Sequence, residues 1–90
     1  MNIDFSKIKE VYGESVVLSI RDSINDVVKN LNYLKELNFT DVEDIFERYC
    51  LIFLDSPETF QDKVNTLIEE LGDSYVDIIE NNLSILENLM

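Results

Sequence analysis

Apolar residues recur at spacings of three and four along most of the chain, which is the pattern of helices with one buried face. The clearest stripe begins after Ser23 and ends at Asn38, a residue type that tolerates the left-handed conformation found at helix ends. Its members are Ile24, Val27, Val28, Leu31, Leu34 and Leu37. A second stripe follows Ser56-Pro57-Glu58, where a capping serine, a first-turn proline and an acid favour a helix start. Its members are Phe60, Val64, Leu67, Ile68 and Leu71, and Gly72 closes it. We therefore expect two longer helices in the middle of the chain.

Shorter helices are predicted on either side of each long one. Thr40 and Glu43 form a capping box, and the stripe behind them consists of Val42, Ile45, Phe46 and Tyr49. Asp73 or Ser74 caps a helix whose inward residues are Tyr75, Val76, Ile79 and Leu83. Two weak stripes, separated by Gly13, predict helices near the start, and they consist of Phe5, Ile8, Val11 and Tyr12, then Val16, Val17 and Ile20. A final short piece, from Ser84 to Met90, presents Ile85, Leu86, Leu89 and Met90.

One apolar run, Tyr49 to Leu54, has the composition of a buried strand. No second strand-like segment is present to pair with it, and an isolated strand is not stable. We therefore expect a buried, tight helical turn at this place. The chain as a whole is predicted to be all-α, with about six short helices and short connections.

The middle of the chain contains an internal repeat of roughly 33 residues, a period typical of helix-pair repeats. In each unit a longer helix stops at Asn38 or Gly72, a shorter helix follows, and a brief apolar segment ends the unit. A degenerate third copy extends over Ile8 to Ile20. The pattern predicts a short solenoid of two to three units, in which each unit buries its apolar side against its neighbours.

This repeat resembles that of the mitochondrial transcription termination factor (mTERF) family. The resemblance lies in Leu34-Lys35-Glu36-Leu37-Asn38-Phe39 and Leu67-Ile68-Glu69-Glu70-Leu71-Gly72, and it covers residues 28–90. Where the family has a proline at the third turn, this chain has Cys50 and Leu83. The resemblance implies a helical-repeat fold and, as function, nucleic-acid binding through a basic concave surface.

Composition supports one small domain over residues 1–90. The chain is 46% hydrophobic, with 2 Gly and 1 Pro, which is enough apolar material for a core and argues against disorder. It has no His and 1 Cys, which excludes a disulfide framework and the usual Cys/His zinc sites and removes the commonest general base. We expect Cys50 to be a core residue, and we expect no enzymatic activity, cofactor or metal.

Charge is distributed unevenly along the chain. The formal net charge is −12, and residues 41–90 carry almost all of it, because Arg48 and Lys63 are their only basic residues. Nucleic acid and anionic membranes should be repelled by such a surface, whereas a basic protein should be attracted. The alternative is that the acids only keep a hydrophobic small domain in solution.

Four residues are candidates for partner binding. Asp73, Asp77 and Glu80 are spaced by four and three, which places three like charges on one helix face. Tyr33 lies off the apolar stripe of its helix, and an exposed tyrosine beside acids suits a protein interface. For both features a plain solvated surface is the alternative.

These observations favour a non-enzymatic acidic protein-interaction module that binds a basic protein. A sharper form is a regulatory inhibitor or immunity-type protein that neutralises a basic nuclease by imitating nucleic-acid charge. The alternative, implied by the family resemblance, is nucleic-acid binding through Lys7, Lys9, Arg21, Lys29 and Lys35.

Two further expectations concern location and assembly. The first ten residues lack the apolar segment of a signal peptide, and no apolar run approaches the roughly 20 residues of a membrane span, so a cytoplasmic location is predicted. The last residues, Leu86, Leu89 and Met90, are apolar. They either fold back onto the preceding helix or form a homo-oligomer or partner contact.

Overall fold

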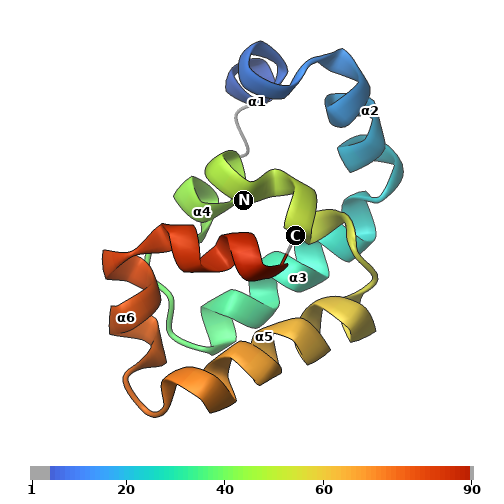
Figure 1. Ribbon diagram of the computed structural model, residues 1–90. Coiled ribbons are helices and arrows are strands. Elements are labelled where there is room, and N and C mark those ends of the chain that lie inside the picture. The colour runs from blue at the N-terminus through green and yellow to red at the C-terminus, as the bar shows by residue number, and fades with distance from the viewer. Residues whose placement is uncertain (1–4, 90) are drawn as a thin grey trace.

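The computed structural model describes residues 5–89, and every regular element among them is helical (Figure 1). The elements are α1 (Phe5–Tyr12), α2 (Glu14–Asp22), α3 (Ile24–Glu36), α4 (Val42–Tyr49), the 3-10 helix η1 (Cys50–Leu54), α5 (Pro57–Leu71), α6 (Tyr75–Asn81) and the 3-10 helix η2 (Leu83–Leu89). The prediction of an all-α fold is confirmed. The predicted tight turn at residues 50–54 is confirmed as η1, in which Cys50, Ile52 and Phe53 are buried.

The ends of the long helices follow the sequence signals. Asn38 has a positive φ of 74°, and the amides of Asn38 and Phe39 bond to the carbonyls of Lys35 and Leu34 at 3.0 and 3.2 Å. This is the Schellman arrangement, which satisfies carbonyls that the helix end would leave unpaired. Gly72 closes α5 with a φ of 80°. Both predicted stops are therefore confirmed.

The caps of the helices follow the sequence less closely. Ser56 caps α5 as predicted, since its side chain accepts a hydrogen bond from the amide of Thr59 and Pro57 begins the helix. The capping box of Thr40 and Glu43 is wrong. The N-cap of α4 is Asp41, whose side chain accepts from the amide of Asp44. Ser23 and Ser74 occupy N-cap positions, but neither makes a capping side-chain hydrogen bond.

The core is organised around α3, which packs against α2, α4, η1 and α5. Val27, Leu31 and Leu34 on its inner face are at most 2% exposed. Three aromatic rings continue the core across the molecule. Phe53 of η1 lies with its ring centroid 5.3 Å from that of Phe46 in α4 and 5.1 Å from that of Phe60 in α5. These rings tie the apolar run of η1 to both neighbouring helices.

The order of elements recurs along the chain. An α-helix, a second α-helix and a 3-10 helix follow one another over Ile24–Leu54, and again over Pro57–Leu89. This order agrees with the internal repeat seen in the sequence. The stacked repeat array and the mTERF resemblance themselves remain predictions.

The last described element folds back across the molecule. In Figure 1, η2 (red) crosses in front of α3, between α4 and α5. Its residues Leu86 and Leu89 are 3% and 6% exposed, and they pack with side chains of α3, α4, α5 and α6. Of the two alternatives for these leucines, packing onto their own chain is therefore what the structure shows. Met90 lies outside the described residues.

Candidate functional site

The three acids predicted to share one helix face are separated by the structure. Asp73 lies in the turn between α5 and α6, because α6 begins only at Tyr75, so the single helix face is wrong. Asp73 and Asp77 are exposed, and Glu80 is half-buried. The first two therefore remain available to a partner in a way that Glu80 does not.

Glu80 makes a contact within the chain. Its Oε1 accepts hydrogen bonds from the backbone amide of Thr40 at 2.8 Å and from the Thr40 hydroxyl at 2.9 Å. Both residues line a surface pocket of about 220 Å³, together with Asp41, Asp44, Ile45 and Leu83. Glu80 thus joins α6 to the start of α4, and its carboxylate lines the same pocket as those of Asp41 and Asp44.

Tyr33 is also engaged within the chain. Its side chain is half-buried against the core, and its hydroxyl donates a hydrogen bond to the side-chain oxygen of Asn65 in α5. The outcome is a link between α3 and α5 rather than a freely exposed ring.

Most basic side chains are matched by acids or by an aromatic ring. Four of them form ion pairs, Lys7 with Glu47 at 3.3 Å, Lys35 with Glu43 at 3.4 Å, Arg48 with Asp44 at 3.1 Å and Lys63 with Asp55 at 2.8 Å. The guanidinium of Arg21 lies over the ring of Phe5, 5.5 Å from its centroid. Cationic groups of the described chain are therefore already neutralised or stacked, apart from Lys9 and Lys29.

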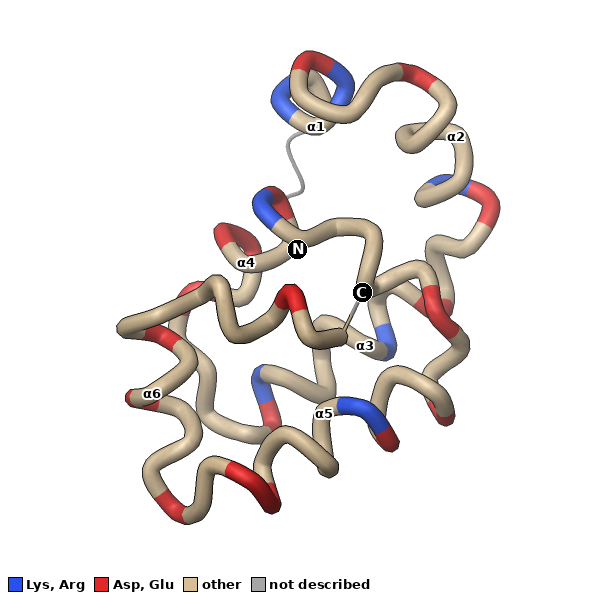
Figure 2. Tube along the Cα trace, viewed as in Figure 1, with Lys and Arg blue, Asp and Glu red and all other residues tan. Residues whose placement is uncertain are grey.

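The acids of α5, the following turn and α6 are not matched in this way. Figure 2 shows acidic positions along α5 and around the turn into α6, with one basic position, Lys63, among them. Lys63 pairs with Asp55, and none of the exposed acids has a basic partner within residues 5–89. We call this set the acidic rim, and it consists of Glu58, Asp62, Glu69, Glu70, Asp73 and Asp77. It contains two of the four residues singled out from the sequence.

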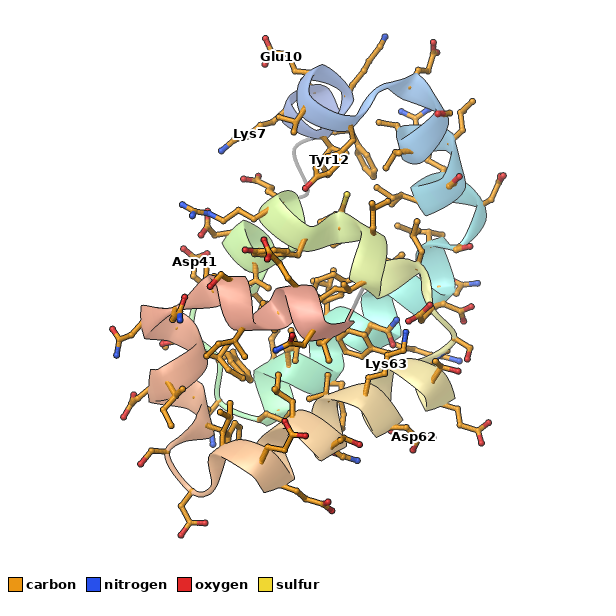
Figure 3. The ribbon with its side chains drawn as sticks, in the orientation of Figure 1. Lys7, Glu10, Tyr12, Asp41, Asp62 and Lys63 are labelled. Atoms are coloured by element: carbon orange, nitrogen blue, oxygen red, sulfur yellow. The ribbon has the colours of Figure 1, made fainter. Side chains whose placement is uncertain are left out.

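Two groups, the Cys50 thiol and the Tyr12 hydroxyl, have pKa values above their ordinary ones. Burial raises the pKa of the Cys50 thiol to about 11, and the residue is fully buried, as predicted. The pKa of Tyr12 is raised as well, first by burial and then by the neighbouring Cys50 and Tyr49. The Tyr12 hydroxyl donates to the carbonyl of Arg48 and so joins α1 to the end of α4 (Figure 3). A thiol of this kind is a poor nucleophile at neutral pH.

One buried polar residue was missed by sequence analysis. Asn30 is fully buried in α3, and its side-chain amide donates to the carbonyls of Phe53 and Asp55, both at 3.0 Å. For Phe53 a side-chain donor replaces a backbone one, because the amide four residues further on would be that of Pro57, which has no N–H. The side-chain oxygen of Asn30 itself has no hydrogen-bond partner. Its only signal in the sequence is one polar position beside the apolar stripe.

Among residues 5–89, no three His, Cys, Asp or Glu side chains are grouped so that they could hold a metal ion. No helix in this part of the chain is long and apolar enough to cross a membrane.

No protein-family model, no curated protein and no solved structure matches the chain.

Proposed function

We propose that the protein is a non-enzymatic interaction module that binds a basic segment of another protein on its acidic rim. The observation that supports this most is the mismatch of charges along the rim. Six exposed carboxylates have no basic partner among the described residues, although four of the chain's basic residues form ion pairs with other acids. Repulsion between unmatched carboxylates raises the free energy of the unbound protein, and a basic partner removes this repulsion on binding. The opposite charges also increase the rate of association.

The narrower form of this proposal is a regulatory inhibitor. In this form, the exposed carboxylates of the acidic rim imitate the negatively charged phosphates that a basic nuclease binds in nucleic acid. The inert thiol of Cys50 agrees with a role in binding rather than catalysis, since the one cysteine of the chain is buried and protonated.

Nucleic-acid binding is the alternative implied by the mTERF resemblance. It would depend on Lys7, Lys9, Arg21, Lys29 and Lys35, and affinity would come from these cations displacing counterions. Lys7 and Lys35 pair with glutamates, and Arg21 lies over Phe5. Nucleic acid would have to displace these contacts, which favours the protein-binding proposal.

The test is capture of binding partners from a lysate of the source cells, with and without nuclease treatment. Three forms of the chain are compared: the wild type, the rim variant Glu70→Gln/Asp73→Asn/Asp77→Asn, and the control variant Glu10→Gln/Glu14→Gln/Asp22→Asn. Both variants remove three negative charges from the net −12, and all six positions are exposed. The control positions lie on α1 and α2, at the other end of the molecule (Figure 1).

The proposal predicts a basic protein that is retained after nuclease treatment, held by the control variant and lost from the rim variant. Recovery of nucleic acid by the wild type, or loss of every bound protein on nuclease treatment, would overturn it in favour of the alternative. Equal retention by the two variants would show that the rim is not the binding surface.

A further inference from the structure

The first two helices pack more on each other than on the rest of the protein. The main neighbour of α1 is α2, and the guanidinium of Arg21 in α2 lies over the ring of Phe5 in α1, 5.5 Å from its centroid. Figure 1 shows the two helices (blue) at the top of the molecule, set apart from α5 and α6. We call residues 5–22 the arm. Because its two helices hold each other, the arm is able to move as one unit.

The arm buries little apolar surface. Ile8 is the buried residue of α1, and Val17 and Ile20 are the buried residues of α2. Val11 and Leu18 are 69% and 52% exposed, so each helix leaves a large apolar side chain in solvent. Segments with few buried apolar contacts open at a lower cost in free energy than the core of the same protein.

A cleft of about 550 Å³ separates the arm from α4 and η2 on one side. Its wall on the arm consists of Lys7, Val11 and Tyr12. Two polar contacts join α1 to the end of α4 beside this cleft. Lys7 pairs with Glu47 at 3.3 Å, and the Tyr12 hydroxyl donates to the carbonyl of Arg48. An exposed ion pair adds little to stability, so we expect the hydrogen bond of Tyr12 to be the stronger of the two contacts.

The connection between the arm and α3 is one residue long. α2 ends at Asp22, α3 begins at Ile24, and Ser23 between them has a φ of −111°, outside the helical range. The Ser23 side chain makes no capping hydrogen bond. Hinges consist of a few residues at the ends of elements that absorb a change in backbone angles. Rotation at Ser23 would turn the arm away without breaking a side-chain cap.

The arm covers the start of η1. Cys50, the first residue of η1, is fully buried. It lies close enough to Tyr12 to contribute to the raised pKa of the Tyr12 hydroxyl. Figure 3 shows the Tyr12 side chain reaching from α1 toward the ribbon below it. Withdrawal of α1 together with Tyr12 would therefore uncover this end of η1.

We propose that the arm is a lid that opens as one unit about Ser23 and thereby exposes the start of η1, with Cys50, to solvent. The closed arm keeps the thiol away from reagents in solution, and the open arm makes it accessible. This device does not depend on the acidic rim, which lies on α5, α6 and the turn between them.

Opening is measured by the rate of disulfide exchange at Cys50 in the full chain. The Cys50 thiolate attacks the sulfur–sulfur bond of dithiobis-nitrobenzoate, forms a mixed disulfide and releases one coloured nitrobenzoate thiolate. When the arm closes faster than the thiolate reacts, the rate is proportional to the open population. The native chain should react at least about tenfold faster than the globally unfolded population allows. Urea unfolding gives that population independently.

A pair of tyrosine variants separates opening of the arm from global unfolding. Tyr12→Phe removes the bond to the carbonyl of Arg48 and keeps the ring, so the rate should rise about fivefold. Tyr33→Phe is the matched control, because it removes a tyrosine hydroxyl bonded to Asn65, between α3 and α5. Its rate should stay within about twofold of wild type. Reaction through global unfolding would instead rise equally in both variants, since each loses one hydrogen bond. In urea all three chains should react equally fast.

Amide hydrogen exchange tests whether the arm opens as one unit. The amides of α1 and α2 should share one opening, at least about tenfold more populated than that of α3, and Tyr12→Phe should raise both together. Equal rates of disulfide exchange in the two variants would overturn the inference. Opening of α1 without α2, or exchange of the arm only through global unfolding, would overturn it as well.

Discussion

Replacement of Asn30 by aspartate should destabilise the protein more than its conservative chemistry suggests. The variant Asn30→Asp keeps the shape of the side chain and removes both donors that serve the carbonyls of Phe53 and Asp55. Each lost hydrogen bond is worth about 1 kcal/mol, and a buried acceptor left without a partner costs about 1–3 kcal/mol. Because Asn30 is fully buried, we expect a loss of about 3–5 kcal/mol, a large share of the roughly 5–15 kcal/mol of a typical domain.

The destabilisation should depend on pH with a defined sign. Burial raises the pKa of the introduced carboxyl above the ordinary value of about 3.9. Between the two pKa values the folded state binds a proton that the unfolded state has released. The stability contributed by this proton is fully present below about pH 4 and is lost as pH rises through the raised pKa of the folded state. Protonated, the group can also donate one of the two hydrogen bonds. The gap between variant and wild type should therefore be smaller at pH 4 than at pH 7.

The assay is equilibrium unfolding in urea, followed by the far-ultraviolet circular dichroism of this all-helical chain. The control is Asn32→Asp, the same change at an exposed position of the same helix, for which we expect a change within about 0.5 kcal/mol. If the two variants differ by less than that, or if the Asn30→Asp gap is the same at both pH values, the bridge from α3 to the end of η1 has been assigned too large a role.

Three other predictions concern the caps of helices, the Cys50 thiol and a buried leucine of η2. Ser56→Ala should cost about 1 kcal/mol of stability in urea unfolding because it removes the cap of α5, whereas Ser23→Ala, at a position without a capping bond, should cost close to none. The pKa of Cys50 in the folded state, about 11, lies above its ordinary value of 9.0. The stability that the protonated thiol contributes is therefore present below pH 9 and should be lost as pH rises through 11. In urea unfolding, Cys50→Ala should lose less stability than wild type over this pH range. Leu86→Ala should cost about 2–5 kcal/mol because Leu86 is 3% exposed, whereas Leu51→Ala, at 40% exposure, should cost under about 1 kcal/mol; similar losses would contradict the described burial of η2.

The helices and their ends could be predicted because their signals are local. Asn38 and Gly72 end their helices by adopting a positive φ, and Ser56 and Pro57 begin α5. Each of these residues affects only the adjacent turn of the chain. The spacing of apolar residues likewise needs no knowledge of distant segments. The all-α fold, the buried turn of η1 and the burial of Cys50 followed from these signals.

What could not be predicted depends on contacts between distant segments. The local pattern predicts Thr40 as the N-cap of α4. In the structure the amide and hydroxyl of Thr40 donate to Glu80, forty residues further along the chain, and Asp41 is the N-cap. Asn30 has no local signal of burial, and its buried side chain bonds to carbonyls more than twenty residues further along the chain. A one-dimensional pattern does not contain such pairings.

The separation of the candidate acids has the same origin. Helical spacing predicts Asp73, Asp77 and Glu80 on one face only for a helix that includes all three residues. The turn after Gly72 delays the start of α6 to Tyr75, and the contact with Thr40 engages Glu80. The acids that remain unmatched instead follow α5 into this turn, a surface that appears only when the ion pairs of the whole described chain are known.

The central claim is that the acidic rim carries the binding, and the salt dependence of affinity tests it most directly. The captured basic protein is titrated with wild type, the rim variant and the control variant across a series of sodium chloride concentrations. With roughly 0.5 kcal/mol for each exposed charge pair, the rim variant should bind about tenfold more weakly at low salt and lose less affinity as salt increases. The control variant should stay within about twofold of wild type. Equal affinities and equal salt slopes for the two variants would contradict the claim.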